Sequence, residues 1–122
     1  MESSSWKITL PWPPSVNNYW GTNGSYKYLK QPGKAYRGVC LLTIYKAFGG
    51  KPKSIAKPVR VKIIACPPDR RKRDLDNLFK APLDALECAG VYFSDNQIAD
   101  LHIVRSDVVQ DGRLEIEIET LG

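Results

Sequence analysis

Apolar and polar residues alternate along several short stretches of the chain, as they do in strands that bury one face. The alternation is clear in residues 6–10 (Trp-Lys-Ile-Thr-Leu) and at the β-branched start of residues 59–66 (Val-Arg-Val-Lys-Ile). Residues 98–104 and 114–118 have the same character and flank an Asp111-Gly112 turn signal. A proline directly follows each of the first two stretches and ends it. We therefore predict four strands.

Two other segments have the periodicity of helices. Apolar positions in residues 34–48 suit an amphipathic helix that stops at Gly49-Gly50. Those in residues 78–89 suit a second helix that stops at Gly90. Residues 21–33 are rich in glycine and contain a proline, so we expect an irregular loop there.

Pro82 leaves two alternatives open for the second helix. Proline costs about 3 kcal/mol inside a helix but almost nothing in its first turn. Either the regular helix starts near Leu78, with residues 74–77 as an initial turn, or the helix is kinked. The order β-α-β-α-β-β predicts an α+β fold, with a mixed sheet and two helices packed on one face. Residues 1–122 show no internal repeat and are expected to form a single domain.

Composition narrows the classes of function. Eighteen basic and thirteen acidic residues give a net charge of +5, which favours polyanionic partners. No apolar run is long enough for a membrane span, and the first residues lack a signal-peptide core, so we expect a soluble cytoplasmic protein. Three cysteines and one histidine, none closely spaced, do not suit structural zinc. We expect three reduced thiols that serve as small core residues.

Residues 69–80 carry the candidate chemistry. Four cations run into two carboxylates one residue apart, with a lysine four residues later: Arg70, Arg71, Lys72, Arg73, Asp74, Asp76 and Lys80. The cations can collect a nucleic-acid backbone. Paired carboxylates can hold Mg²⁺, which binds through one or two carboxylates plus substrate phosphates. The metal can then neutralise the scissile phosphate and lower the pKa of an attacking water. The lysine can stabilise transition-state charge or hold that water.

A simpler interpretation is available for the same residues. Asp is a favoured helix N-cap, and Asp76 with Lys80 has the spacing of a helical ion pair. Capping explains only one of the two aspartates, and it leaves the four cations unexplained. Asp95, on a predicted turn after the second helix, is a possible third ligand, and Asp100 is another candidate. Three further aspartates are expected to be surface charge: Asp69, Asp84 and Asp107.

Other residues suggest a wider nucleic-acid surface. The cations of residues 70–73 are the predicted phosphate contacts, and Lys27, Lys30, Lys34 and Arg37 extend that patch. Four aromatic residues of the glycine-rich segment could stack on unpaired bases or pack in the core: Tyr19, Trp20, Tyr26 and Tyr28. The Pro-Trp-Pro-Pro run of residues 11–14 fits a rigid corner after a strand better than a polyproline ligand.

The chain resembles the RusA family of Holliday junction resolvases, small endonucleases of phage and prophage type. The likeness runs through residues 8–15, 35–37, 68–78 and 112–115. It is most specific in Arg-Asp-Leu-Asp-Asn followed by Lys80, with Asp95-Asn96-Gln97 about twenty residues on. The resemblance implies a homodimer that nicks four-way DNA junctions symmetrically with Mg²⁺, or with Mn²⁺ as a substitute. It implies that Asp74, Asp76 and Asp95 bind metal and that Lys80 is catalytic.

Two departures from the family pattern are modest. Ser94 stands where relatives often carry another acid, which would weaken metal affinity, and Pro82 is displaced by one position. A junction has approximate two-fold symmetry, so a two-fold dimer could present one site to each of two equivalent strands. Two alternatives remain open: a non-catalytic nucleic-acid-binding module, and a nuclease that acts on linear DNA or RNA.

Overall fold

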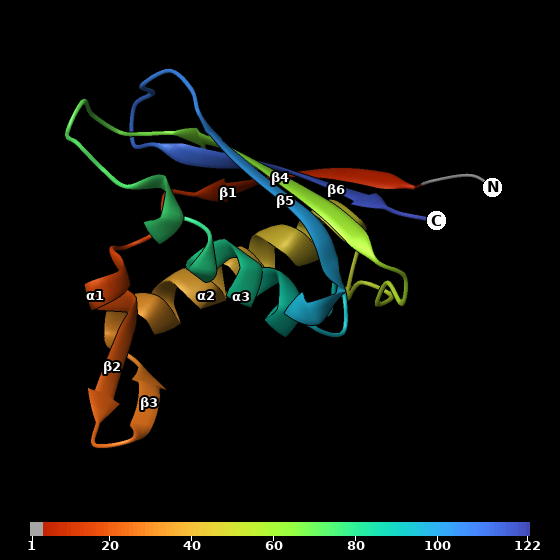
Figure 1. The fold of residues 1–122 in the computed structure, drawn as a ribbon, viewed down its shortest axis with the longest axis horizontal. Coiled ribbons are helices and arrows are strands. Elements are labelled where there is room, and N and C mark those ends of the chain that lie inside the picture. Colours follow the sequence, from red (N-terminus) through yellow and green to blue (C-terminus); the bar gives the residue numbers. More distant parts are fainter. Residues whose placement is uncertain (1–3) are drawn as a thin grey trace.

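A four-stranded mixed sheet carries the helices of the chain on one of its faces (Figure 1). The structure is a computed structural model and describes residues 4–122. The strand order is β1-β6-β4-β5, in which β4 and β5 are parallel and the other pairs antiparallel. The elements are β1 (Ser5–Pro11), α1 (Val16–Tyr19), β2 (Trp20–Asn23), β3 (Tyr26–Leu29), α2 (Gln31–Phe48), β4 (Val59–Cys66), η1 (Leu75–Asn77), α3 (Lys80–Ala89), η2 (Asp95–Gln97), β5 (Ile98–Arg105) and β6 (Arg113–Thr120).

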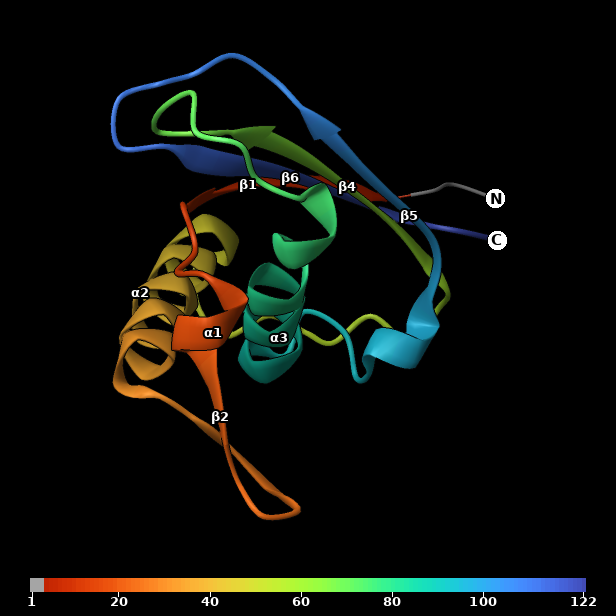
Figure 2. The same cartoon turned by 60° about the vertical axis from the view of Figure 1, so that its left-hand side comes forward.

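The core lies between this sheet and helices α2 and α3 (Figure 2). Alternate residues of β4 point inward and are fully buried: Val59, Val61, Ile63 and Ala65. The intervening residues Arg60 and Lys62 lie on the exposed outer face of the sheet. The alternation seen in the sequence thus separates a helix-covered face from a solvent face, and the predicted α+β architecture is confirmed.

The prediction of an irregular loop over residues 21–33 is wrong. Two short antiparallel strands, β2 and β3, form a hairpin there, and α2 begins at Gln31 with Pro32 in its first turn. Gly24 opens the two-residue hairpin turn with a φ of 66°, a conformation that favours glycine. The Asn-Gly signal therefore marked a hairpin, whose strands were too short to show a clear alternation.

The structure selects the first alternative for Pro82. Helix α3 begins at Lys80, so Pro82 falls in its first turn, where a missing N–H costs little. The 3₁₀ turn at Leu75–Asn77 precedes the helix. No helix within residues 4–122 has the length and apolar character needed to cross a bilayer.

The cysteines agree only partly with the expectation. Cys40 and Cys66 are buried, and burial raises the pKa of the Cys40 thiol to about 12. Cys88 is exposed on α3, so the prediction that it packs in the core is wrong. All three thiols are free of disulfide bonds.

Two glycines of α2 give a matched test of the packing. A Cβ on Gly33 would lie 2.6 Å from the Tyr19 carbonyl oxygen, whereas one on Gly38 would meet nothing within 4 Å. We expect Gly33→Ala to lower the free energy of unfolding by about 1–3 kcal/mol through overpacking. Gly38→Ala should raise it by about 0.5–1 kcal/mol, because alanine restricts the unfolded chain. Urea unfolding of both variants measures the difference, and equal effects would contradict this packing.

Candidate active site

Lys80 and Asp95 lie in one cleft, although fifteen positions separate them in the chain. Lys80 is the first residue of α3, and Asp95 opens the turn that leads back to the sheet. The cleft has a volume of about 470 Å³ and is lined by Trp20, Lys27, Phe79, Lys80, Leu83, Asp84, Asp95, Ile98 and Leu101. The predicted lysine and one predicted carboxylate therefore share a hollow that also has aromatic and apolar walls.

Asp95 is held by hydrogen bonding. The hydroxyl of the buried Tyr92 donates to Oδ1 of Asp95 at 2.9 Å, and the Leu83 carbonyl lies 3.1 Å from the same hydroxyl. Burial, and then the nearby Asp95 carboxylate, raise the pKa of Tyr92, so the phenol stays neutral and can donate. Burial and Asp95 also raise the pKa of Glu87. Glu87 is a further carboxylate beside Asp95. The sequence did not indicate it, because its closeness to Asp95 depends on the turn after α3.

Gln97 fixes the turn that presents Asp95. Its side-chain oxygen accepts from the N–H groups of Phe93 (2.8 Å) and Ser94 (3.0 Å). Its amide nitrogen donates to the carbonyls of Ile55 (2.7 Å) and Lys57 (3.0 Å). Four hydrogen bonds from one side chain thus join the turn to a distant loop, which gives a physical reason for glutamine two residues after the aspartate.

Ser94 also has a structural part in this turn. It precedes η2, and its Oγ accepts from the N–H of Asn96 at 3.1 Å. A serine is a favoured cap at such a position. Ser94 therefore stabilises the local geometry of Asp95.

Asp74 and Asp76 lie on the exposed turn before α3. Asp74 has an extended backbone and makes no capping hydrogen bond, and Phe79 precedes the helix instead. The N-cap interpretation is therefore wrong for both aspartates. Asp76 lies in η1 and Lys80 in α3, so they do not share one continuous helix. Within residues 4–122, neither aspartate forms an ion pair or a side-chain hydrogen bond.

The donor set suits a hard cation, but the described chain does not assemble a complete cage. Two exposed carboxylates without cationic partners, one residue apart, are ligands of the kind that Mg²⁺ uses together with substrate phosphates. Among residues 4–122, however, no group of three His, Cys, Asp or Glu side chains is close enough to hold one metal ion. Asp95 therefore does not join Asp74 and Asp76 in a preformed three-carboxylate site within this chain.

Arg73 differs from the other cations of its run. It pairs with Asp69 at 2.8 Å, its side chain is 23% exposed, and its guanidinium lies 5.4 Å from the ring centroid of Trp12. Arg105 donates to the Arg73 carbonyl at 2.7 Å, which anchors the backbone directly before Asp74. Arg73 is thus partly used in shaping the loop. Arg71 also pairs with Asp69, at 3.3 Å, but its side chain remains 81% exposed.

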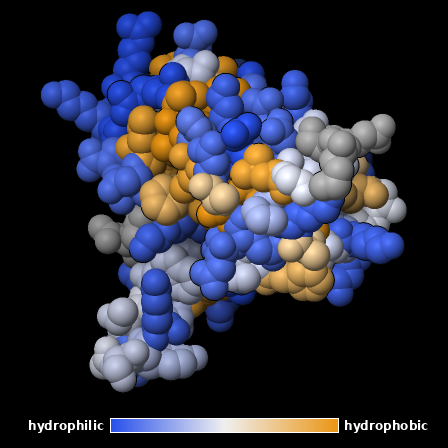
Figure 3. Space-filling view, turned by 45° about the vertical axis from the view of Figure 1, so that its right-hand side comes forward, coloured by the Kyte–Doolittle hydropathy of each residue, from blue (hydrophilic) through white to orange (hydrophobic). Residues whose placement is uncertain are grey.

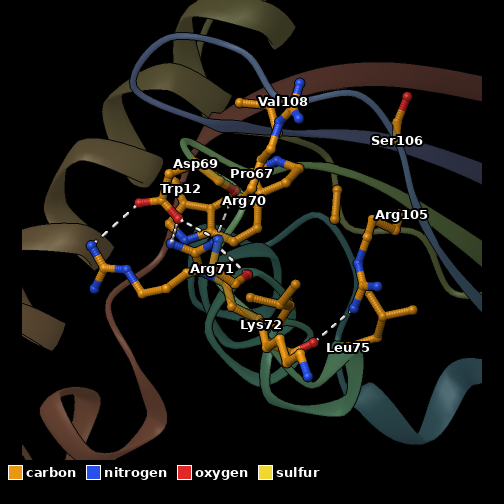
Figure 4. Close-up of a pocket in the computed structure, with 13 residues that line it drawn as sticks. Trp12, Pro67, Asp69, Arg70, Arg71, Lys72, Leu75, Arg105, Ser106 and Val108 are labelled. Carbon is orange, nitrogen blue, oxygen red and sulfur yellow. Dashed lines mark hydrogen bonds and ion pairs between the residues drawn. The ribbon is translucent and has the colours of Figure 1, made fainter.

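A pocket of about 260 Å³ lies at this loop. Figure 4 shows Trp12 and Pro67 among its walls and the cations Arg70, Arg71 and Lys72 around it. Asp69 accepts from the backbone N–H of Arg71 at 3.0 Å. That hydrogen bond, together with Arg73, lowers the pKa of Asp69. A lowered pKa means that the loop is stabilised above the ordinary pKa of an aspartate and loses this support on acidification. Asp69 is a partly exposed charge that also stabilises the loop through its pairs with Arg71 and Arg73.

Asp84 ties three helices together. Its carboxylate accepts two hydrogen bonds from Arg37, each at 3.0 Å, and one from the Tyr19 hydroxyl at 2.6 Å. Arg37, predicted to contact DNA, is therefore engaged by a protein carboxylate, and Asp84 is not the simple surface charge that we expected. Asp100 pairs with Arg60 at 2.8 Å and with His102 at 2.8 Å on the outer face of the sheet, away from the cleft.

Cations that attract phosphates, next to carboxylates that have no cationic partner, fit one class of protein: the nucleases that cut phosphodiester bonds. A family model described as "Endodeoxyribonuclease RusA" matches residues 11–119. The chain is 41% identical over 119 residues to a crossover junction endodeoxyribonuclease RusA of Escherichia coli strain K12, covering 98% of each chain. It is 40% identical over 121 residues to that of Enterobacteria phage 82, again with 98% of each covered. The chain belongs to the RusA family of endodeoxyribonucleases.

Two buried tyrosines allow the support of Asp95 to be tested. Tyr92→Phe removes the hydroxyl that donates to Asp95, and Tyr36→Phe removes one that donates to the Pro11 carbonyl at 2.8 Å. Each should cost about 0.5–1.5 kcal/mol of stability. Only Tyr92→Phe should also slow DNA nicking, by about 10- to 100-fold, as losses of outer-shell partners do. Parallel thermal melts and single-turnover nicking assays separate the effects. Equal nicking rates would exclude a role for Tyr92 in positioning Asp95.

Proposed function

We propose that this chain resolves four-way DNA junctions by paired, metal-dependent nicks. The observation that carries the proposal is the shared cleft of Lys80 and Asp95, reached from a cationic loop and a turn with two unpaired carboxylates. The relatives at about 40% identity are named crossover junction endodeoxyribonucleases, and they cover nearly the whole chain. DNA is therefore the substrate, and a branched junction is the form of DNA that we propose.

The proposed ligands of Mg²⁺, or of Mn²⁺ in its place, are Asp74, Asp76 and Asp95. When bound, the metal neutralises charge on the scissile phosphate and lowers the pKa of the attacking water. Asp74 and Asp76 are exposed and available to the cation together with phosphate oxygens. Asp95 lies in the cleft with its orientation set by Tyr92. Because the three are not preassembled in one chain, the proposal requires substrate and metal to complete the site.

Lys80 is the proposed catalytic cation. It is exposed at the start of α3 and lines the cleft. Within residues 4–122 its ammonium forms no ion pair with a carboxylate. An ammonium there can stabilise the charge that develops on the phosphate or hold the attacking water. The cations Arg70, Arg71 and Lys72 are the proposed contacts to the DNA backbone. Lys27, which lines the cleft together with Lys80, is a further proposed phosphate contact.

A homodimer is the proposed working form. A junction offers two equivalent strands related by an approximate two-fold axis, and a two-fold dimer presents the same site to both. A single site would have to nick, release and bind again, which would leave the junction half cut. Sedimentation of the protein alone and with a junction would measure the stoichiometry.

A substitution at the carboxylate turn separates catalysis from binding. We expect Asp76→Asn to abolish nicking of a synthetic four-way junction in Mg²⁺, because a metal ligand is removed. Binding should survive or tighten, since a negative charge near phosphates is removed. Asp107→Asn, an exposed aspartate outside the site, is the charge-matched control and should leave both unchanged.

The same assay decides between the alternatives. Wild-type protein that leaves junctions intact with Mg²⁺ would favour a non-catalytic binding module. Equal cleavage of linear duplex at matched, moderate salt would favour a nuclease without junction selectivity, because low salt hides selectivity under nonspecific attraction. Omission of divalent metal should stop the reaction in either nuclease, and nicking in chelator would refute metal dependence.

Salt dependence tests the cationic loop. Removal of one cation that neutralises a phosphate should reduce the slope of log K against log salt by about 0.9 on duplex arms. We expect Ala substitution of Arg70, Arg71 and Lys72 together to flatten the slope, while Arg73 is kept for its role in the loop. Ala substitution of the exposed linker lysines Lys51, Lys53 and Lys57 is the control with the same change in charge. An unchanged slope in the first variant would show that residues 70–72 form a solvated loop and do not contact phosphates.

A further inference from the structure

The β2–β3 hairpin projects from the body of the protein at the end of α1 (Figures 1 and 2). Its two faces differ, because side chains alternate along each strand. Trp20 and Lys27 lie on one face, with the ammonium 4.5 Å from the Trp20 ring centroid, and both line the cleft of Lys80 and Asp95. Tyr26 and Tyr28 lie on the other face. The hairpin thus forms one wall of the proposed active site and carries a tyrosine pair on its far side.

Tyr28 has a structural explanation. It pairs with Gly21 across the hairpin, and a Cβ on Gly21 would lie only 2.5 Å from its ring. The ring therefore covers the glycine backbone, which stabilises a hairpin that is otherwise only marginally stable. Packing on the hairpin accounts for the 40% exposure of this residue.

Tyr26 has no comparable explanation. It is 66% exposed and faces Asn23 across the hairpin. Its ring is nearly parallel to that of Tyr28, with an interplanar angle of 16° and centroids 6.3 Å apart. The separation is near the upper end of the range for interacting rings, so the two rings make a loose pair. A large aromatic surface is therefore held in a defined orientation, on a projecting element, in contact with solvent.

The charge of the surroundings identifies the kind of partner. No Asp or Glu occurs between Ser3 and Pro68, a stretch that contains eleven Lys or Arg residues and the whole hairpin. In Figure 3 the hairpin projects at the lower left, and its surface is hydrophilic to neutral. The orange apolar patch lies elsewhere, on the upper part of that view. A second copy of the chain would place this cationic segment against like charge or would need an acidic patch. A polyanion that carries planar, apolar rings would be attracted by the positive charge and could stack on the aromatic pair.

We propose that Tyr26, supported by Tyr28, is a stacking site for an unpaired nucleobase. Taking DNA as the ligand rests on the proposed function. Base–aromatic stacking tolerates any sequence, because every base has a π-face, and basic residues beside the rings hold the backbone. Since the opposite face of the hairpin lines the cleft, the stacked base belongs to a strand that runs beside the one to be cut. A branch point supplies a neighbouring strand with bases that can be unpaired, whereas the bases of a continuous duplex are paired and stacked.

The test uses binding without cleavage, in chelator. Full-length protein is titrated with oligothymidylate and with an abasic backbone of the same length, which keeps the phosphates and lacks the bases. We expect Tyr26→Ala to weaken oligothymidylate binding by about 5- to 150-fold and to leave abasic binding unchanged. Tyr26→Phe keeps the ring and should retain wild-type affinity. Leu42→Ala, at a 72% exposed residue of α2, is the control for removal of an exposed apolar side chain and should change neither.

Three results would overturn the stacking site. They are equal weakening on both ligands, no weakening on either, and a changed sedimentation coefficient of the free Tyr26→Ala protein, which would make the hairpin an interface between copies. Circular dichroism melts confirm that the variants are folded. A protein that shows the expected preference for bases but never nicks a junction would refute the proposed function alone. A protein that nicks junctions with its base preference unchanged by Tyr26→Ala would refute the stacking site alone.

Discussion

The ion pair between Arg37 and Asp84 holds together the parts on which the site depends. Arg37 belongs to α2 and Asp84 to α3, and the Tyr19 hydroxyl at the end of α1 donates to the same carboxylate. The pair is bidentate and its side chains are only 30% and 22% exposed, so water screens it less than a surface pair. Trp20 follows Tyr19 directly and begins the hairpin. The network therefore sets the position of the hairpin wall relative to the helix that carries Lys80.

The second anchor of the site is the Gln97 side chain. It connects the Asp95 turn to the loop before β4, while Tyr92 connects the same turn to α3. Asp95 is thus fixed from two directions, whereas the exposed side chains of Asp74 and Asp76 make no hydrogen bond or ion pair within residues 4–122. One rigid carboxylate and two adaptable ones are consistent with a site that is completed only when substrate arrives, since Mg²⁺ takes part of its coordination from phosphates.

Regular periodicity explains which parts of the fold could be predicted. The strand β4 alternates over its first five residues, and α3 ends at a glycine with a φ of 84°, so local pattern and final structure agree. The β2–β3 hairpin has four residues in each strand, too few for an alternation to stand out from the glycines around it. The protein partners of Arg37 and Arg73 could not be predicted for a different reason. A charged residue in a sequence shows its sign but not its partner, and Asp84 lies forty-seven positions from Arg37.

The distribution of charge along the chain supports the proposal of a divalent cation. The cations are concentrated in the first half of the chain and in residues 70–73, whereas most carboxylates follow Asp69. Asp74 and Asp76 directly follow the cations of residues 70–73, so a phosphate held by those cations would lie close to carboxylates. Two like charges 4 Å apart repel by about 4 kcal/mol near a protein surface. Lys80 offsets only one of these charges. The divalent cation that we propose, if held by these carboxylates, would offset this repulsion near the bond to be cut. The same carboxylates would then weaken binding without metal and promote cleavage with it, which makes binding and catalysis separable in this protein.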